Sequence, residues 1–346
     1  IYSGDVYYHI KQSTENLENI RLFNFVTITP LIENNTIDWI IDVQERWYIW
    51  PLPILEYAST NLSAFIEERD LSRLRYGAYI SIDNFRGMRE ELKLRMVTGH
   101  RKELALRYSM QNLDKAKQHG LSANISYFTN NEIAYNLLNN KLLWYESFDK
   151  PAKKVFTSEL SYKYRPLHFW HHTISIGHRN ISTLEEVVTL NDNFLGDGDS
   201  YFSYSYVKYQ LLWNRRNSNV FPLSGHYVKT ELSRMGIMRN ESIGFWELKL
   251  WGGYYKNLFH RTNAGSDILL VKKNKTNLPF IISEAIGYKD FIRGYEYYVT
   301  NGSNYFINKN SLKFELLPTR QINLPFISSD KFRKAHLSIH WSIFCD

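Results

Sequence analysis

Apolar and polar residues alternate with a period of two over most of the chain, which is the pattern of β-strands whose two faces meet different surroundings. The alternation is clear in residues 201–208, where Ser203 and Ser205 lie on one face and Phe202 and Tyr204 on the other. From residue 51 onward we count about thirteen such segments, separated by turn residues and without crossover helices. This succession predicts an antiparallel meander or barrel. The predicted strands are 75–85, 91–97, 103–110, 119–128, 157–164, 168–177, 201–213, 226–232, 243–255, 266–271, 280–288, 306–317 and 335–344, with one predicted helix, 182–190, among them.

The first 46 residues follow a different pattern. Residues 13–20 have helical character, with Ser13 as the N-cap. Residues 22–28 and 36–43 alternate as two strands joined by a turn at Pro30 and Asn34-Asn35. We therefore predict a small α/β domain in residues 1–46 and a β-barrel domain in residues 47–346. A generic α+β module is the alternative interpretation of the first part.

The composition decides between a soluble and a membrane-embedded β structure. Aromatic residues make up 16% of the chain, and the mean hydropathy is −0.40. No segment approaches the roughly 18 uncharged apolar residues that a spanning helix needs. A soluble sandwich or propeller needs a dry aliphatic face, but alternate positions such as Lys93, Arg95, Arg107 and Ser109 are polar. Aromatic residues such as Trp170 gather at strand ends, as they do at membrane interfaces. We therefore predict a transmembrane barrel.

Charge and cysteine content exclude several other classes. The net charge is +7, but the basic residues are dispersed, and we expect no nucleic-acid partner. The single cysteine, Cys345, permits neither an intrachain disulfide nor a cysteine metal cage. No phosphate-binding loop or dinucleotide fingerprint occurs, and we expect no cofactor.

Three groups of residues resemble metal or catalytic sites. On a strand, His168, His172 and His178 would share one face and His171 the other, and we expect them to be interfacial or luminal side chains. Ser175 and His178 would lie on opposite faces of a strand, and no nucleophile elbow occurs, so we predict no enzyme activity. The candidates for calcium binding are Asp197, Gly198 and Asp199, where a plain polar turn is the preferred interpretation.

Four passages resemble, in order, motifs of the BamA/TamA-like outer-membrane assembly family, the bacterial surface antigen superfamily. They are the hairpin of residues 22–46, which is similar to the end of a POTRA domain, the turn of residues 83–92, the segment Phe221-Pro222-Leu223-Ser224-Gly225, and the segment Ile292-Arg293-Gly294-Tyr295. The resemblance covers nearly the whole chain.

The resemblance implies a barrel of about sixteen strands in the bacterial outer membrane, preceded by a periplasmic POTRA domain. The segments that we count are fewer. The end of the chain, Phe344-Cys345-Asp346, is similar to the start of the family's Phe-x-Asp-x-Gly strand motif. We therefore expect the last strands, and the beginning of the POTRA unit, to lie outside this sequence.

The resemblance also assigns roles to individual residues. Arg293 would enter the lumen and pair with Asp346, because a guanidinium screened from water needs a bidentate carboxylate. Gly294 would allow a tight turn, and Tyr295 would pack its ring in the lumen with its hydroxyl hydrogen-bonded. Together with Ile292, these residues are a predicted loop latch.

Two further sets of residues follow from the resemblance. The first barrel strand would form one side of a lateral seam, weakened by Pro51 and Pro53, which lack backbone donors; its predicted residues are Leu52, Ile54, Leu55 and Tyr57. The POTRA strands would bind incoming chains by β-augmentation; their predicted residues are Phe23, Phe25, Val26, Ile28, Ile40 and Val43.

The function that the resemblance implies is insertion or translocation of client proteins at the outer membrane, without bond chemistry. The alternatives are a secretion pore of the two-partner type and a plain porin or receptor. The implied partners are unfolded outer-membrane or secreted clients, a lipid bilayer with lipopolysaccharide, and periplasmic or lipoprotein subunits.

Overall fold

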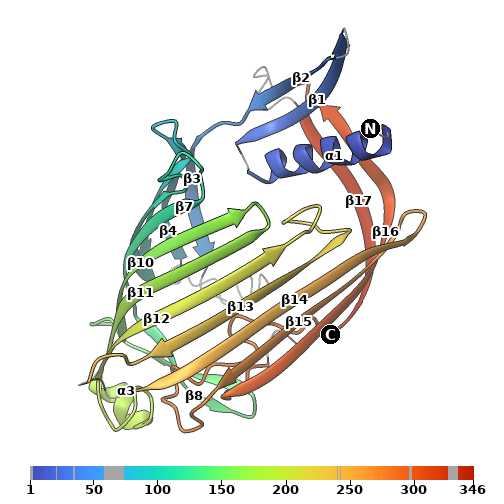
Figure 1. Cartoon of the computed structure of the whole chain (residues 1–346). Helices are drawn as coiled ribbons and strands as arrows, with labels where there is room; N and C mark the ends of the chain where they lie inside the picture. The colour runs from blue at the N-terminus through green and yellow to red at the C-terminus, as the bar shows by residue number, and fades with distance from the viewer. Residues whose placement is uncertain are drawn as a thin grey trace.

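The structure, a computed structural model, describes residues 3–20, 22–33, 36–57, 74–239, 241, 243–295, 298–325 and 334–346. Its largest element is an antiparallel sheet of 13 strands in which each strand pairs with its neighbours in the chain, apart from one inserted hairpin. Figure 1 shows this sheet curling around a concave face. The strands in sheet order are β3 (Ile49–Tyr57), β4 (Leu74–Phe85), β5 (Glu90–Gly99), β6 (Arg101–Met110), β7 (His119–Asn130), β10 (Lys153–Leu167), β11 (Trp170–Thr183), β12 (Tyr201–Asn214), β13 (Gly225–Met235), β14 (Phe245–Phe259), β15 (Thr262–Lys273), β16 (Asn304–Asn323) and β17 (Lys334–Cys345).

The predicted antiparallel β architecture is confirmed, but a closed barrel is not shown. Strands β3 and β17 are the two edges of the sheet, and they do not pair with each other in the part of the chain that the structure describes. No helix among the described residues is long and apolar enough to cross a membrane.

The predicted strand 280–288 is wrong. Residues 274–303 connect β15 to β16, and in their described parts, 274–295 and 298–303, the only strand-like pairs are the bridges Glu284–Asn301 and Ile286–Asp290. The apolar run that begins at Phe280 is buried against other loops instead of in a sheet. The hairpin of β8 (Glu132–Leu138) and β9 (Lys141–Glu146) was not predicted, and helix α3 spans only Glu185–Leu190 because the preceding residues extend β11.

The two faces of the sheet have opposite chemistry. On the concave face, Ser109, Ser122, Ser161 and Ser175 stand directly opposite one another on β6, β7, β10 and β11, and all four are buried. On the convex face, large apolar side chains are exposed; they include Leu104, Leu106, Ile125, Leu160, Ile174 and Ile176. An apolar outer face over a polar inner face is the arrangement of strands in a membrane barrel.

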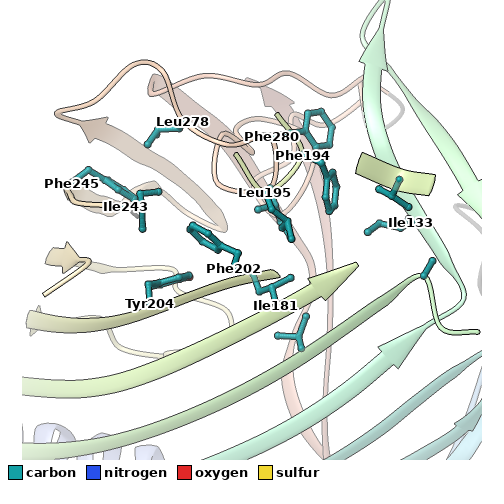
Figure 2. Packing of buried hydrophobic residues seen from close by; sticks show 14 of the residues in the cluster. Ile133, Ile181, Phe194, Leu195, Phe202, Tyr204, Ile243, Phe245, Leu278 and Phe280 are labelled. Atoms are coloured by element: carbon teal, nitrogen blue, oxygen red, sulfur yellow. The ribbon is translucent and has the colours of Figure 1, made fainter. Parts of the chain in front are cut away.

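One end of the concave face is closed by a dry core, which we call the distal cap. Figure 2 shows its side chains meeting from the β8–β9 hairpin, the α3 region, the loop 274–303 and the wall strands. The buried members are Ile133, Ala152, Val155, Ile181, Val187, Phe194, Leu195, Phe202, Tyr204, Tyr206, Ile243, Phe245, Leu278, Phe280 and Ile281. Backbone bonds from Phe280 to Asn193 (2.8 Å) and from Ile281 to Phe194 (3.3 Å) join the loop to the α3 region. The distal cap thus fixes the base of loop 274–303.

The N-terminal unit lies at the opposite, proximal end (Figure 1). Helix α1 spans Ser3–Asn19, so the helix begins ten residues before the predicted N-cap Ser13. Strands β1 (Phe23–Glu33) and β2 (Thr36–Glu45) form a two-stranded antiparallel sheet. Pro30 pairs with Trp39 inside this sheet and is not part of the turn, whereas the other predicted turn residues, Asn34 and Asn35, lie outside the described residues. The ring of Phe25 lies 4.9 Å from that of His336, which places β1 beside the start of β17.

Candidate functional site

Loop 274–303 folds back on itself over the concave face. Its two arms are joined by backbone hydrogen bonds from Ala285 to Thr300 (3.1 Å) and from Thr300 to Ile286 (2.8 Å). Gly287 allows this close approach: its φ is +95°, and a Cβ there would lie 2.2 Å from the carbonyl oxygen of Tyr298. A side chain at this position is therefore excluded both by conformation and by space.

The tip of the loop is a tight turn through the predicted latch residues. The backbone N–H of Tyr295 donates to the carbonyl oxygen of Ile292 at 3.1 Å, and Gly294 has a φ of +86°. A positive φ at the third position of a four-residue turn is the geometry that favours glycine. The turn projects Arg293 from its second position.

The structure brings Arg293 and Asp346 together. The guanidinium Nε donates to both carboxylate oxygens of Asp346, at 3.0 and 2.8 Å, and Nη2 also donates to Oδ1. The backbone N–H of Arg293 donates to the same carboxylate at 3.0 Å. The Asp346 side chain is 1% exposed and that of Arg293 is 36% exposed, so the acid is fully covered by its partner and neighbours. A charged pair in this geometry is among the stronger polar contacts in proteins.

Strands β16 and β17 complete the surroundings of Arg293. Its Nη2 donates to the carbonyl oxygen of Asn310 on β16 at 3.2 Å, and its guanidinium carbon lies 4.3 Å from the ring centre of Phe344 on β17. Phe344 and Asp346 are two residues apart and therefore point to the same face of the strand. The spacing Phe-x-Asp thus supplies a stacking surface and a counter-ion for one guanidinium.

Tyr295 differs from the prediction. Its side chain is 62% exposed, and its ring lies 6.0 Å from the ring of Tyr298. The predicted hydrogen bond of its hydroxyl does not occur among the described contacts. The turn directs Arg293 toward the wall, and the ring of Tyr295 stays in the open space beside it.

A second segment reaches the same two strands from the proximal end. The ammonium of Lys313 on β16 donates to the carbonyl oxygen of Pro222 at 3.2 Å and lies 4.3 Å from the ring centre of Phe221. The Phe221 ring also lies 4.8 Å from that of His340 on β17. The turn 215–224, which carries the predicted Phe-Pro-Leu-x-Gly motif, therefore crosses β14 and β15 to contact β16 and β17. Sequence reasoning missed Lys313 and His340 because their contacts depend on strand register.

Asp267 on β15 lies between these two contact regions. It accepts hydrogen bonds from Tyr227 (3.3 Å) and from Tyr255. Its negative charge also acts on both Arg293 and Lys313. The loop tip and the turn 215–224 therefore share an electrostatic neighbour, although they come from opposite ends of the sheet.

The predicted seam residues all lie on β3, one of the two sheet edges. Leu52 and Ile54 stand opposite Tyr79 and Gly77 of β4, and Tyr57 stands opposite Leu74. Leu55 is 74% exposed on the convex face. Pro51 and Pro53 are in the same edge strand, where a missing backbone donor is tolerated.

The predicted POTRA residues form part of the two-stranded sheet. Phe23, Phe25, Val26 and Ile28 belong to β1, whereas Ile40 and Val43 belong to β2. Val26 stands opposite Val43 and is buried, while Ile40 is 52% exposed. The second strand thus presents apolar side chains at an exposed position.

The histidine and aspartate candidates are dispersed. His172 bonds to Tyr209 (2.9 Å), His178 bonds to Ser205 (2.9 Å), and His171 contacts the carbonyl oxygen of His168, which lies in a turn (2.9 Å). Within the described ranges, no group of three or more His, Cys, Asp or Glu side chains has a metal-binding arrangement. In the segment of Asp197, Gly198 and Asp199, Asp197 and Gly198 have φ values of +54° and +74°, as in a tight turn.

No family model and no curated protein matches this sequence. Among solved structures, the chain is similar to a crystal structure of BamA from Haemophilus ducreyi lacking POTRA domains 1–3, with a TM-score of 0.53 and 15% identity over 97% of this chain and 65% of that one. It is also similar to CdiB from Escherichia coli, with a TM-score of 0.56 and 10% identity over 98% of this chain and 64% of that one. The chain thus spans just under two thirds of either neighbour. The resemblance to the BamA/TamA-like family is confirmed at the level of the fold.

Proposed function

We propose that this chain, which shares its fold with BamA and CdiB, is an outer-membrane protein that inserts or translocates client polypeptides without bond-making chemistry. In this proposal, residues 47–346 belong to the membrane barrel and residues 1–46 to a partial POTRA-like domain in the periplasm. The observation that carries the proposal is the contact of Arg293 with Asp346, which holds a long loop inside a membrane-type sheet. Clients, lipopolysaccharide-containing lipid and accessory subunits are the proposed partners.

The mechanism that we propose uses the loop as a plug with two attachment points. The distal cap fixes the base of the loop, and the pair of Arg293 and Asp346 holds its tip against β16 and β17. Releasing the tip exchanges one charged pair for contacts with water or client. The plug can therefore move without unfolding the wall, which suits a protein that must admit a chain and reseal.

The sheet edge at β3 provides a second element of the mechanism. An edge strand offers unpaired backbone groups to an incoming strand, and such groups are costly when they face lipid. Prolines 51 and 53 shorten the ladder that β3 can form, which favours exchange over permanent pairing. Leu52, Ile54, Leu55 and Tyr57 are the proposed contact residues of this seam.

Insertion and translocation predict different losses in the cell. The two structural neighbours correspond to these two roles, an insertase for BamA and a two-partner secretion transporter for CdiB. Depletion of this protein, followed by quantitative profiling of outer-membrane and secreted proteins, tests both. A general loss of outer-membrane barrels supports insertion, and loss of one secreted protein supports translocation. If both profiles stay unchanged while uptake of a small solute falls, the protein is a porin or receptor and the proposal is wrong.

A further inference from the structure

Five cationic side chains gather on the concave face at its proximal end. We call this group the cationic belt: Arg89 in the turn before β5, Lys93 on β5, Arg107 on β6, and Lys163 and Arg165 on β10. Lys93 and Arg107 stand directly opposite one another in the β5–β6 ladder. Lys163 and Arg165 are two residues apart and share a face. Like charges directly opposite on neighbouring strands destabilise a sheet, so the arrangement has a cost that the fold alone does not require.

The belt carries more positive charge than its surroundings neutralise. Lys93 pairs with Glu91 at 2.8 Å, and Arg165 donates to the carbonyl oxygen of Lys117 at 2.7 Å. In the part of the chain that the structure describes, the side chains of Arg89, Arg107 and Lys163 form no ion pair or hydrogen bond. Lys163 is repelled by Arg107, Lys93 and Arg165, and the charge of Glu91 opposes this repulsion.

Three of the five belt residues face open space. A cavity of about 280 Å³ is lined by Arg89, Lys163 and Arg165, with Glu91 as its one acidic lining residue. It adjoins a larger cavity of about 760 Å³ between the sheet and α1, which Arg89 and Arg165 also line. The remaining charged side chains that line the larger cavity are Lys11, Lys117, Arg215 and Arg216, against Glu15 alone.

Two of these guanidinium groups are held by aromatic rings and not by carboxylates. Arg215 lies 4.3 Å from the ring centre of Phe169, and Arg216 lies 4.2 Å from that of Tyr227. Cation–π contacts orient a guanidinium while leaving its full charge available to a further partner. The proximal opening therefore has an excess of positive charge, with Glu91, Glu15 and Asp114 as the nearby acids.

We propose that the cationic belt binds the carboxylates of an acidic stretch in an extended polypeptide. The cations are spread over β5, β6 and β10, with β7 between the last two. Strands lie about 4.8 Å apart, so the cations on β5, β6 and β10 form a row across the sheet along which an extended chain can lie, and inorganic phosphate is the competing ligand that the test below must separate. An extended chain with acidic residues at alternate positions places carboxylates roughly 7 Å apart along the belt.

Amide side chains in the larger cavity fit the same ligand. Gln118, Asn214, Asn217 and Asn219 line it, and amides pair with peptide groups of an extended chain. A cationic opening also raises the local concentration of an acidic segment and speeds its encounter. This inference goes beyond the proposed function, because binding of the acidic segment does not depend on whether a client is inserted, translocated or released.

The test is a binding measurement with the full chain in non-ionic detergent micelles. The probes are three fluorescein-labelled peptides of equal length, with Glu-Ser, Gln-Ser or Lys-Ser repeats, followed by fluorescence anisotropy. We expect the Glu-Ser peptide alone to bind, with an affinity that falls as salt rises, because exposed charges are screened. Equal binding of the Gln-Ser peptide overturns the proposal without the need for any variant.

Variants then locate the site. The double variant Lys163→Gln with Arg165→Gln should weaken binding of the Glu-Ser peptide about tenfold or more. The matched control removes two lysines from the exposed convex side of the same sheet, Lys102→Gln with Lys256→Gln, and should change the affinity less than twofold. Equal weakening by both pairs contradicts a localised site. Displacement of the peptide by an equimolar amount of inorganic phosphate, or equally tight binding of a single-stranded oligonucleotide, contradicts the assignment to a polypeptide.

Discussion

The ring of Tyr206 on β12 occupies the space directly over Gly177 on β11, where an added Cβ would lie 2.4 Å from the tyrosine Cζ. The Tyr206 hydroxyl then donates to Glu159 on β10 at 2.8 Å, and Lys208 donates to the same carboxylate oxygen at 2.9 Å. One side chain thus ties three strands together across a glycine. The same arrangement recurs where Tyr227 covers Gly253 and where Tyr255 covers Gly265.

Replacing Gly177 should therefore destabilise the wall. Gly177→Val displaces the Tyr206 ring and breaks its bond to Glu159, and we expect a loss of about 1–3 kcal/mol in the free energy of unfolding. Denaturant titration in micelles, followed by tryptophan fluorescence, measures it. The control is Gly302→Ala, where the nearest atom to an added Cβ is 3.8 Å away, and its unfolding midpoint should hardly move. Equal midpoints for the two variants contradict the interlocking role of Tyr206.

Arg293→Ala should loosen the tip of loop 274–303 without unfolding the sheet. The variant leaves the covered Asp346 carboxylate without its partner, which costs about 1–3 kcal/mol locally. Hydrogen exchange of amides 285–300 should become faster by at least tenfold, while those of β10 and β11 keep their protection. Arg293→Lys should give an intermediate rate, since an ammonium cannot reproduce the bidentate geometry. As a control, Lys289→Ala removes a cation from the same loop. If hydrogen exchange of amides 285–300 is as fast in Lys289→Ala as in Arg293→Ala, the latch is not specific to Arg293.

The two glycines of the loop should differ in their tolerance. Gly287→Ala places a Cβ 2.2 Å from the Tyr298 carbonyl oxygen, so the two arms of the loop must separate. At Gly294, nothing lies within 4 Å of an added Cβ, and Gly294→Ala incurs only the left-handed strain of about 1 kcal/mol. Limited proteolysis should therefore cut the Gly287→Ala loop much faster than the Gly294→Ala loop. The reverse order would show that the arms are not closely packed.

Lys313→Met should release the turn 215–224 from β16. The substitution keeps an apolar stem of similar length but removes the bond to Pro222 and the cation over Phe221. We expect faster hydrogen exchange in residues 217–224, by a factor of about 5 for a loss near 1 kcal/mol. Lys256→Met, at an exposed position of β14, is the matched control and should leave that segment unchanged. If both variants behave alike, the turn is held by its own internal hydrogen bonds.

The sequence predicts the strands well because their period of two persists over whole segments. The place of Asp346 beside Arg293 was predicted only through the resemblance to the BamA/TamA-like family, and the structure brings the two residues together. The apolar run at Phe280 was misassigned because burial in the distal cap and burial in a sheet leave the same short pattern. The sequence also could not place Tyr206 over Gly177. These residues are 29 positions apart, and their contact depends on the register between β11 and β12.

The polar residues of the site also fall into those that could be predicted from the sequence and those that could not. Arg293 was identified because its segment resembles a loop motif of the BamA/TamA-like family, whereas Lys313 and the cationic belt residues on strands follow the ordinary alternating pattern and no motif marks them. The exposure of Tyr295 was missed because a motif gives the direction of only one side chain in a four-residue turn. The sequence predicts where a residue lies along its strand, but it does not predict which side chains from distant strands and turns contact that residue on the concave face.

The distal cap has a consequence for how the chain samples other conformations. A dry apolar core with aromatic members opens only at a free-energy cost close to that of global unfolding, whereas a tip held by one charged pair opens far more often. We therefore expect the base of loop 274–303 to open rarely and its tip to open often, with the boundary near Gly287. On this basis, the frequency of plug opening can change through Arg293 alone while the fold keeps its lifetime.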